Sequence, residues 1–82
     1  MNGEPTAVFS IYDDKDKEIK ELMTSVYNAL QEKGYNPINQ LVGYILSEDP
    51  TYITTYQNAR TQICKIDRDD LLQALLKNYL QG

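Results

Sequence analysis

Histidine and tryptophan are absent from the sequence, and cysteine and phenylalanine occur once each among its 82 residues. A single cysteine excludes an internal disulfide, and one thiol without any imidazole does not make a zinc site. Cys64 also has no histidine with which to form a nucleophilic pair, and no acid–base pair can be assembled elsewhere. We therefore expect no metal, no cofactor and no enzymatic activity.

Basic side chains are scarce, because 8 Lys and Arg residues accompany 12 Asp and Glu residues and give a net charge of −4. Proteins that bind nucleic acid need clustered Lys and Arg to displace counterions from phosphate, and anionic membranes attract the same residues. The sequence also lacks an apolar run of about 18 residues and the features of a signal peptide. We expect a cytoplasmic chain with a reduced Cys64, no nucleic-acid partner and no direct membrane insertion.

Stabilising cross-links are missing as well, although the chain is short. A chain of this length forms one domain, and a single small core typically supplies only about 3–5 kcal/mol. With neither disulfide nor metal available, a second subunit is the remaining support. We predict a homodimer.

Two helices and the connection between them give the clearest local pattern. Apolar residues recur with helical spacing between residues 15 and 33. Gly34 can end that helix with a positive φ, Asn36 can cap the next one, and Pro37 suits its first position. The spacing of Ile38 and the apolar residues after it predicts a second helix from Pro37 to about Ser47. The second stripe comprises Ile38, Leu41, Val42 and Ile45.

Gly43 lies inside this second helix, where it costs roughly 1 kcal/mol relative to alanine. We expect another backbone to approach it closely. Pro50 ends the helix, because the residue before a proline avoids the α region. Asp49 is expected to cap a turn or a short helix that starts there.

The remaining sequence predicts two more helices. Thr54 and Gln57 have the spacing of a capping box, which favours a helix over about 55–64. A wide apolar face follows Asp67 and predicts the last helix. The fold class is therefore all-α: a small bundle of about four short helices in residues 15–82, after an N-terminal arm in residues 1–14. Apolar alternation over 7–12 leaves two options for that arm, a disordered segment or a strand paired with its own copy, and we favour an arm that is mobile before Ala7 and loosely docked after it.

Seven tyrosines suggest surfaces that are partly apolar and partly wet, as at interfaces. Tyr27 and Tyr79 lie on apolar stripes and are expected in the core. The candidate interface residues cluster around the second helix and its two ends. They are Tyr35, Gly43, Tyr44, Tyr52 and Tyr56.

The only concentrated positive charge is provided by Arg60, Lys65 and Arg68. These side chains could hold a phosphate or a partner carboxylate, or they could balance the nearby acidic residues 67, 69 and 70. Cys64 is expected to be a small, half-buried filler. Thr6, in the arm beside Pro5, could be an ordinary terminal threonine or a phosphate acceptor.

The string Val-Tyr-Asn-Ala-Leu-Gln-Glu-Lys-Gly-Tyr-Asn-Pro-Ile-Asn-Gln-Leu-Val-Gly-Tyr-Ile-Leu-Ser at 26–47 resembles the IreB family of small cytoplasmic Firmicute proteins. Asp-Pro-Thr-Tyr-Ile at 49–53 and Arg-Asp-Asp-Leu-Leu at 68–72 extend the resemblance, which spans about Thr6 to Leu80. The resemblance implies a helical homodimer with a flexible arm. It also implies a substrate of a membrane-spanning Ser/Thr kinase, with a matching phosphatase, in the response to envelope stress and cell-wall antibiotics.

The family's phosphorylatable threonine corresponds to Thr6, because Phe9 and Ile11 match the apolar pair that follows it. Some positions depart from the family pattern. Glu48 replaces a usual glycine, and Cys64 stands where a basic residue is common. Our leading hypothesis is a non-enzymatic regulatory protein that is phosphorylated on Thr6. The alternative is a structural or adaptor module that binds another protein independently of phosphorylation.

Overall fold

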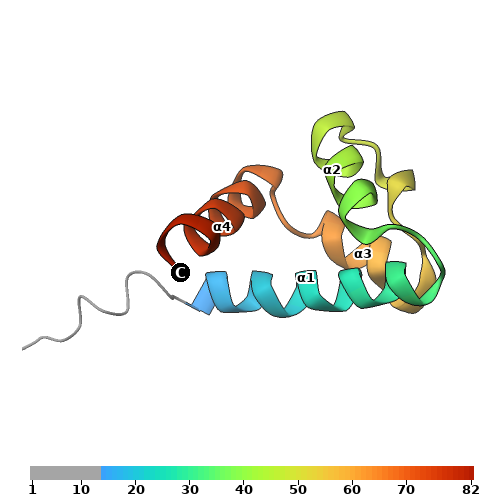
Figure 1. Ribbon diagram of the computed structural model, residues 1–82, viewed down its shortest axis with the longest axis horizontal. Helices are drawn as coiled ribbons and strands as arrows, with labels where there is room; N and C mark the ends of the chain where they lie inside the picture. The colour runs from blue at the N-terminus through green and yellow to red at the C-terminus, as the bar shows by residue number, and fades with distance from the viewer. Residues whose placement is uncertain (1–13) are drawn as a thin grey trace, which may run out of the picture.

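The computed structural model describes residues 14–82, so the predicted arm, its strand-like segment and Thr6 lie outside the described residues. Helix α1 spans Asp14–Glu32 and runs along the base of the molecule (Figure 1). Asp14 and Asp16 occupy its first turn, where negative charge is favoured by the helix dipole. Its buried residues form one stripe: Ile19, Val26, Ala29 and Leu30.

The connection from α1 to α2 follows the local pattern. Gly34 has a φ of +86°, and the amide of Tyr35 donates to the carbonyl of Leu30 at 3.0 Å. These features belong to a Schellman motif, in which a glycine in the left-handed region ends the helix. Helix α2, Pro37–Ser47, begins where the Asn36 side chain accepts a hydrogen bond from the amide of Asn39 at 3.1 Å. The predicted stop and start are both confirmed.

Helix α2 ends at Glu48, which has a φ of +63° although it is not glycine. The 3₁₀ turn η2, Pro50–Tyr52, follows at once. Asp49 caps this turn, and its carboxylate accepts hydrogen bonds from the Thr51 amide at 3.0 Å and the Thr51 hydroxyl at 2.7 Å. These bonds lower the pKa of the Asp49 carboxyl. The predicted role of Asp49 is confirmed.

The third helix begins later than predicted. The 3₁₀ turn η3, Tyr56–Asn58, precedes helix α3, Ala59–Cys64. Gln57 and Asn58 both have positive φ values, so neither can stand in the first turn of a helix. The Thr54 hydroxyl accepts from the amide of Tyr56 at 3.2 Å rather than closing a box with Gln57. The predicted capping box is therefore wrong.

Helix α4, Arg68–Gln81, lies over the N-terminal half of α1 (Figure 1). It contributes one buried residue, Leu71, to the core. An ion pair of 2.7 Å joins Lys15 to Asp70 and ties the start of α1 to α4. A second ion pair, between Asp16 and Lys77 at 2.9 Å, joins α1 to the second half of α4.

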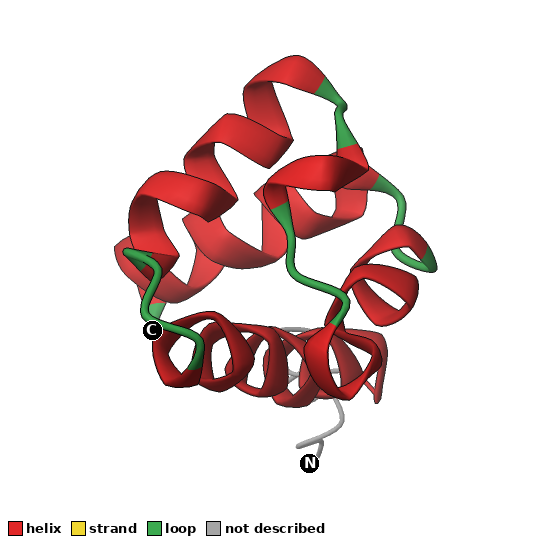
Figure 2. Cartoon of the chain, turned by 90° about the vertical axis from the view of Figure 1, so that its right-hand side faces the viewer, coloured by secondary structure: helices red, strands yellow, loops and turns green. Residues whose placement is uncertain are grey.

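Helix α1 is the shared support of the core, because it contacts α2, α3 and α4. All described elements are helices joined by short loops (Figure 2). For the part of the chain that the structure describes, the all-α architecture with four α-helices is confirmed. Within residues 14–82 five large side chains are fully buried, and each stabilises the fold by about 1.5–3 kcal/mol. They are Val26, Leu30, Ile53, Ile63 and Leu71.

Candidate interaction site

Helix α2 presents an apolar stripe to solvent. Ile38, Val42 and Leu46 follow one another at intervals of four residues, and Leu46 is 79% exposed. Leu41 and Tyr44 are the buried residues of this helix. The predicted stripe of Ile38, Leu41, Val42 and Ile45 is therefore not one buried face in the single chain, because the buried face is centred on Leu41 and Tyr44 and leaves Ile38 and Val42 exposed. Large apolar side chains arranged in this way are typical of a binding surface.

Helix α4 carries a second exposed apolar stripe. Tyr79, expected in the core, is 85% exposed, and Tyr27 on α1 is also exposed. Both core predictions are wrong. Leu71 is the only buried residue of α4, so the large apolar side chains on the rest of this helix remain exposed. The exposed apolar residues of α4 are Leu72, Leu75, Leu76, Tyr79 and Leu80.

The predicted tyrosine cluster divides into exposed and buried members. Tyr35 and Tyr52 are exposed, whereas Tyr56 is half-buried with the Lys33 ammonium 5.1 Å from its ring centroid. Tyr44 is only 5% exposed, so its ring belongs to the core of the single chain.

Tyr44 and Cys64 form a weakly polar pair. The Tyr44 hydroxyl lies 4.0 Å from the Cys64 sulfur. The pKa of the Tyr44 hydroxyl is raised, mainly by burial and to a smaller extent by this hydrogen bond. Cys64 itself is exposed, so the prediction of a half-buried filler is wrong.

Gly43 makes room for a ring rather than for a second backbone. A Cβ atom built on Gly43 would lie 2.4 Å from Cε1 and 2.6 Å from Cδ1 of Tyr52. Distances below 3.0 Å require something to move. The Tyr52 carbonyl accepts a hydrogen bond of 2.9 Å from the Gln40 side chain, which holds η2 against α2. The close approach expected at Gly43 therefore comes from within the chain.

The two arginines of the basic group hold the backbone of neighbouring segments. Arg60 donates from Nε to the Ile53 carbonyl at 2.8 Å. Arg68 donates to the Ile45 carbonyl at 3.2 Å and pairs with Glu48 at 2.9 Å, which joins the start of α4 to the end of α2. These partners differ from the acidic residues 67, 69 and 70 that the sequence suggested. Each arginine therefore has a structural role.

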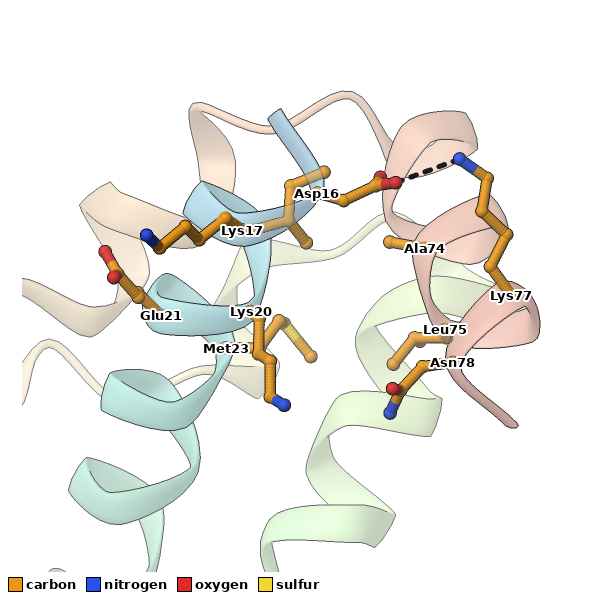
Figure 3. A pocket seen from close by; sticks show the side chains of 10 residues that line it. Asp16, Lys17, Lys20, Glu21, Met23, Ala74, Leu75, Lys77 and Asn78 are labelled. Carbon is orange, nitrogen blue, oxygen red and sulfur yellow. Dashed lines mark hydrogen bonds and ion pairs between the residues drawn. The ribbon is translucent and has the colours of Figure 1, made fainter. Parts of the chain in front are cut away.

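A groove of about 420 Å³ lies between α1 and α4. Ile19 and Met23 line it from α1, and Ala74 and Leu75 line it from α4. Figure 3 shows Leu75 and Asn78 on the side of α4 that faces α1. The lining is mostly apolar, and sequence periodicity did not indicate it because the two walls come from opposite ends of the chain.

An ion pair joins the two walls of this groove. The Lys77 ammonium lies 2.9 Å from the Asp16 carboxylate, and the pair is partly buried (Figure 3). Within residues 14–82 there is no group of three or more His, Cys, Asp or Glu side chains that could hold a metal ion. Nor does that part of the chain contain a helix long and apolar enough to cross a membrane.

Comparison with known proteins places these features in a family. The family model described as "IreB regulatory phosphoprotein" matches residues 4–81. A UPF0297 protein of Ruminiclostridium cellulolyticum is 57% identical over 82 residues, which cover all of this chain and 93% of the relative. A UPF0297 protein of Acetivibrio thermocellus is 54% identical over 81 residues, which cover 99% of this chain and 90% of the relative. The chain belongs to the IreB family of regulatory phosphoproteins.

Proposed function

We propose that this protein is a non-enzymatic regulator that a membrane Ser/Thr kinase phosphorylates on Thr6 and a phosphatase restores. The process would be the response to cell-envelope stress and cell-wall antibiotics. The observation that carries the proposal is the match of residues 4–81, which include Thr6, to a family of regulatory phosphoproteins. Because a kinase draws its phosphate from ATP, the proposal also places the chain in the cytoplasm.

The physical effect of the modification is electrostatic. A phosphate adds about −1.5 to −2 charges at neutral pH. The chain already carries a net charge of −4, and Asp13, Asp14 and Asp16 lie seven to ten residues after Thr6. Added negative charge beside these carboxylates is repulsive at short range. Phosphorylation would therefore change which partners the start of α1 can accept.

The kinase assay requires a matching Ser/Thr kinase, ATP and intact-mass measurement. Wild-type protein should gain one phosphate, and Thr6→Ala should gain none. Two controls, Ser10→Ala and Thr61→Ala, should behave like wild type; Ser10 shares the N-terminal segment, and Thr61 is an exposed threonine of α3. An unmodified wild-type chain, or a phosphate that persists in Thr6→Ala, would reject the site.

A homodimer is the second part of the proposal. The exposed apolar stripes of α2 and α4 support it, since a stable interface needs a desolvated apolar centre. Light scattering should give twice the 9.4 kDa mass of one chain. Val42→Lys and Leu76→Lys should shift the protein toward monomer, whereas Asn39→Lys and Gln81→Lys, on exposed polar positions of the same helices, should not. Unchanged mass in both lysine variants would place the interface elsewhere.

The adaptor alternative relies on the exposed Tyr35 beside the α2 stripe. In that case partner capture would depend on Tyr35 and would be indifferent to residue 6. Tyr35→Ala should then abolish capture while Thr6→Ala leaves it intact. The reverse pattern supports the phosphorylation-dependent regulator. Tyr44→Ala is unsuitable for this comparison, because Tyr44 is buried.

A further inference from the structure

The groove between α1 and α4 combines apolar walls with a cationic rim. Its walls include the buried Ile19, the half-buried Met23 and Ala74, and Leu75, which is 39% exposed. Its volume of about 420 Å³ lies within the range of small-molecule pockets, about 300–1,000 Å³. Such pockets are mostly apolar and carry a few polar groups that orient the ligand.

Lys20 is the polar group that the fold leaves available at this groove. Within residues 14–82 Lys20 forms no ion pair, whereas Lys77 is paired with Asp16. Figure 3 shows the Lys20 ammonium and the Asn78 amide in the space between α1 and α4, while the Lys17 side chain extends away from α4. A lysine lays its methylene groups along apolar surface and keeps its ammonium in water. A cation therefore lies at the edge of the apolar walls.

We propose that this groove binds a free single-chain amphiphile with an anionic head group, of the fatty-acid type. The hydrocarbon tail covers Met23 and Leu75, which removes apolar surface from water. The carboxylate of the ligand accepts a hydrogen bond from the Lys20 ammonium. Because Lys20 is exposed, the head group stays hydrated and neither charge is buried.

The charges around the groove select an anion, although the whole chain carries a net charge of −4. Three lysines and two carboxylates line the groove, and one lysine and one carboxylate already pair with each other. The apolar stripe of α2 offers a comparison, because no residue of Pro37–Ser47 is charged. The charged residues of the groove are Asp16, Lys17, Lys20, Glu21 and Lys77.

The length of the groove sets the length of the tail. Along α1 the groove runs from Asp16 to Met23, which is about 10 Å at 1.5 Å per residue. With C–C bonds of about 1.5 Å in a zigzag, roughly eight carbons of an extended chain span this distance. Each methylene that leaves water raises the affinity by up to about fourfold. The affinity should therefore rise from hexanoate to octanoate and level off beyond decanoate.

The first test is an NMR titration of the isotope-labelled full chain with decanoate below its micelle concentration. The amides of Ala74, Leu75 and Asn78 should shift and reach saturation, and those of Val42 and Leu46 on α2 should shift much less. Decyltrimethylammonium, which has the same tail and a cationic head, should bind at least about threefold more weakly. Equal binding of the two amphiphiles, or equal shifts on α2, would overturn the proposal.

Two matched pairs of variants test the residues that we assign to the site. Lys20→Gln should weaken decanoate binding by about two- to fivefold, and Lys17→Gln should weaken it less. Leu75→Ser should weaken binding of both amphiphiles, whereas Leu76→Ser, at an exposed position outside the lining, should weaken neither. Equal effects within either pair would show that the ligand does not lie in this groove.

Two further measurements distinguish other occupants of the groove. Decanoate affinity that falls as the protein concentration rises would show that a second copy covers the groove, and would overturn the proposal. An anionic bilayer repels an acidic chain, so the protein should not float with phosphatidylglycerol vesicles. Flotation would assign the surface to a membrane instead of a free amphiphile. None of these assays involves Thr6 or a kinase, so their results are independent of the proposed phosphorylation.

Discussion

Gly43 gives the sharpest test of how α2 and η2 pack together. In Gly43→Ala the new methyl group would lie 2.4 Å from the Tyr52 ring, so the ring must move. The ring is 39% exposed, and swinging it fully into solvent would expose roughly 100 Å² of buried surface, a cost of about 2.5 kcal/mol. Alanine recovers about 1 kcal/mol of helix propensity. We expect a net loss of stability of up to about 1.5 kcal/mol.

The change in stability caused by Gly43→Ala should have the opposite sign when Tyr52 is also replaced. In a Tyr52→Ala chain the obstructing ring is gone, and Gly43→Ala should then stabilise the protein by about 1 kcal/mol. Urea unfolding of the four proteins of this double-mutant cycle measures the coupling between the two positions. Stabilisation in both backgrounds would show that the ring does not restrict residue 43. Destabilisation in both would show that something other than Tyr52, such as a partner subunit, approaches Gly43.

Three other substitutions probe separate features. In urea unfolding, the Glu48→Gly variant should be more stable than the Glu48→Gln variant by about 1 kcal/mol. Both variants lose the ion pair with Arg68, but only glycine adopts the positive φ of residue 48 without strain. Equal stabilities would show that the positive φ does not strain the Glu48 backbone. Leu71→Ala should lower the free energy of unfolding by about 2–5 kcal/mol, because Leu71 is the buried residue of α4. In hydrogen exchange, the amides of α4 should lose protection before those of α1. Equal protection of α4 and α1 in this variant would contradict the role of Leu71. The raised pKa of Tyr44 means that the neutral hydroxyl is favoured in the fold, so its contribution is present below about pH 10 and lost as pH rises through the folded pKa. Between about pH 9 and 11 the free energy of unfolding should therefore fall less for Tyr44→Phe than for wild type. An equal fall in both proteins would contradict a raised pKa for the Tyr44 hydroxyl.

The sequence predicted those parts of the fold that depend on local chemistry. Gly34, Asn36 and Pro37 determine how α1 ends and α2 begins, and each acts through its own backbone or a neighbour three residues away. Asp49 acts over the same range. Because such signals need no tertiary contact, they can be read from the chain alone.

Which apolar side chains are buried was much less predictable from the sequence. The apolar residues of α2 cover more than one face of the helix. Its packing against α1 and η2 decides which face is buried, so that Leu41 is covered while Ile38 and Val42 are exposed. Tyr79 has the spacing of a core residue, but it is exposed. Periodicity identifies an apolar stripe without stating whether the same chain or a partner covers it.

The sequence did not indicate which residues far apart along the chain contact each other. Arg68 has acidic neighbours in sequence, yet it bonds to the Ile45 carbonyl and to Glu48. Gln57 has a side chain suited to a capping box, but its positive φ removes it from the helix. The groove between α1 and α4 likewise depends on residues about sixty positions apart, such as Asp16 and Lys77.

The most direct test of the central proposal is the intact mass of the protein isolated from its native cells before and during envelope stress. Phosphorylation on Thr6 predicts that a fraction of the wild-type chain carries one phosphate, that this fraction changes under stress, and that Thr6→Ala carries none. A chain that stays unmodified under every condition, or an equal phosphate content in Thr6→Ala, would contradict the assignment of this protein as a regulator controlled through Thr6.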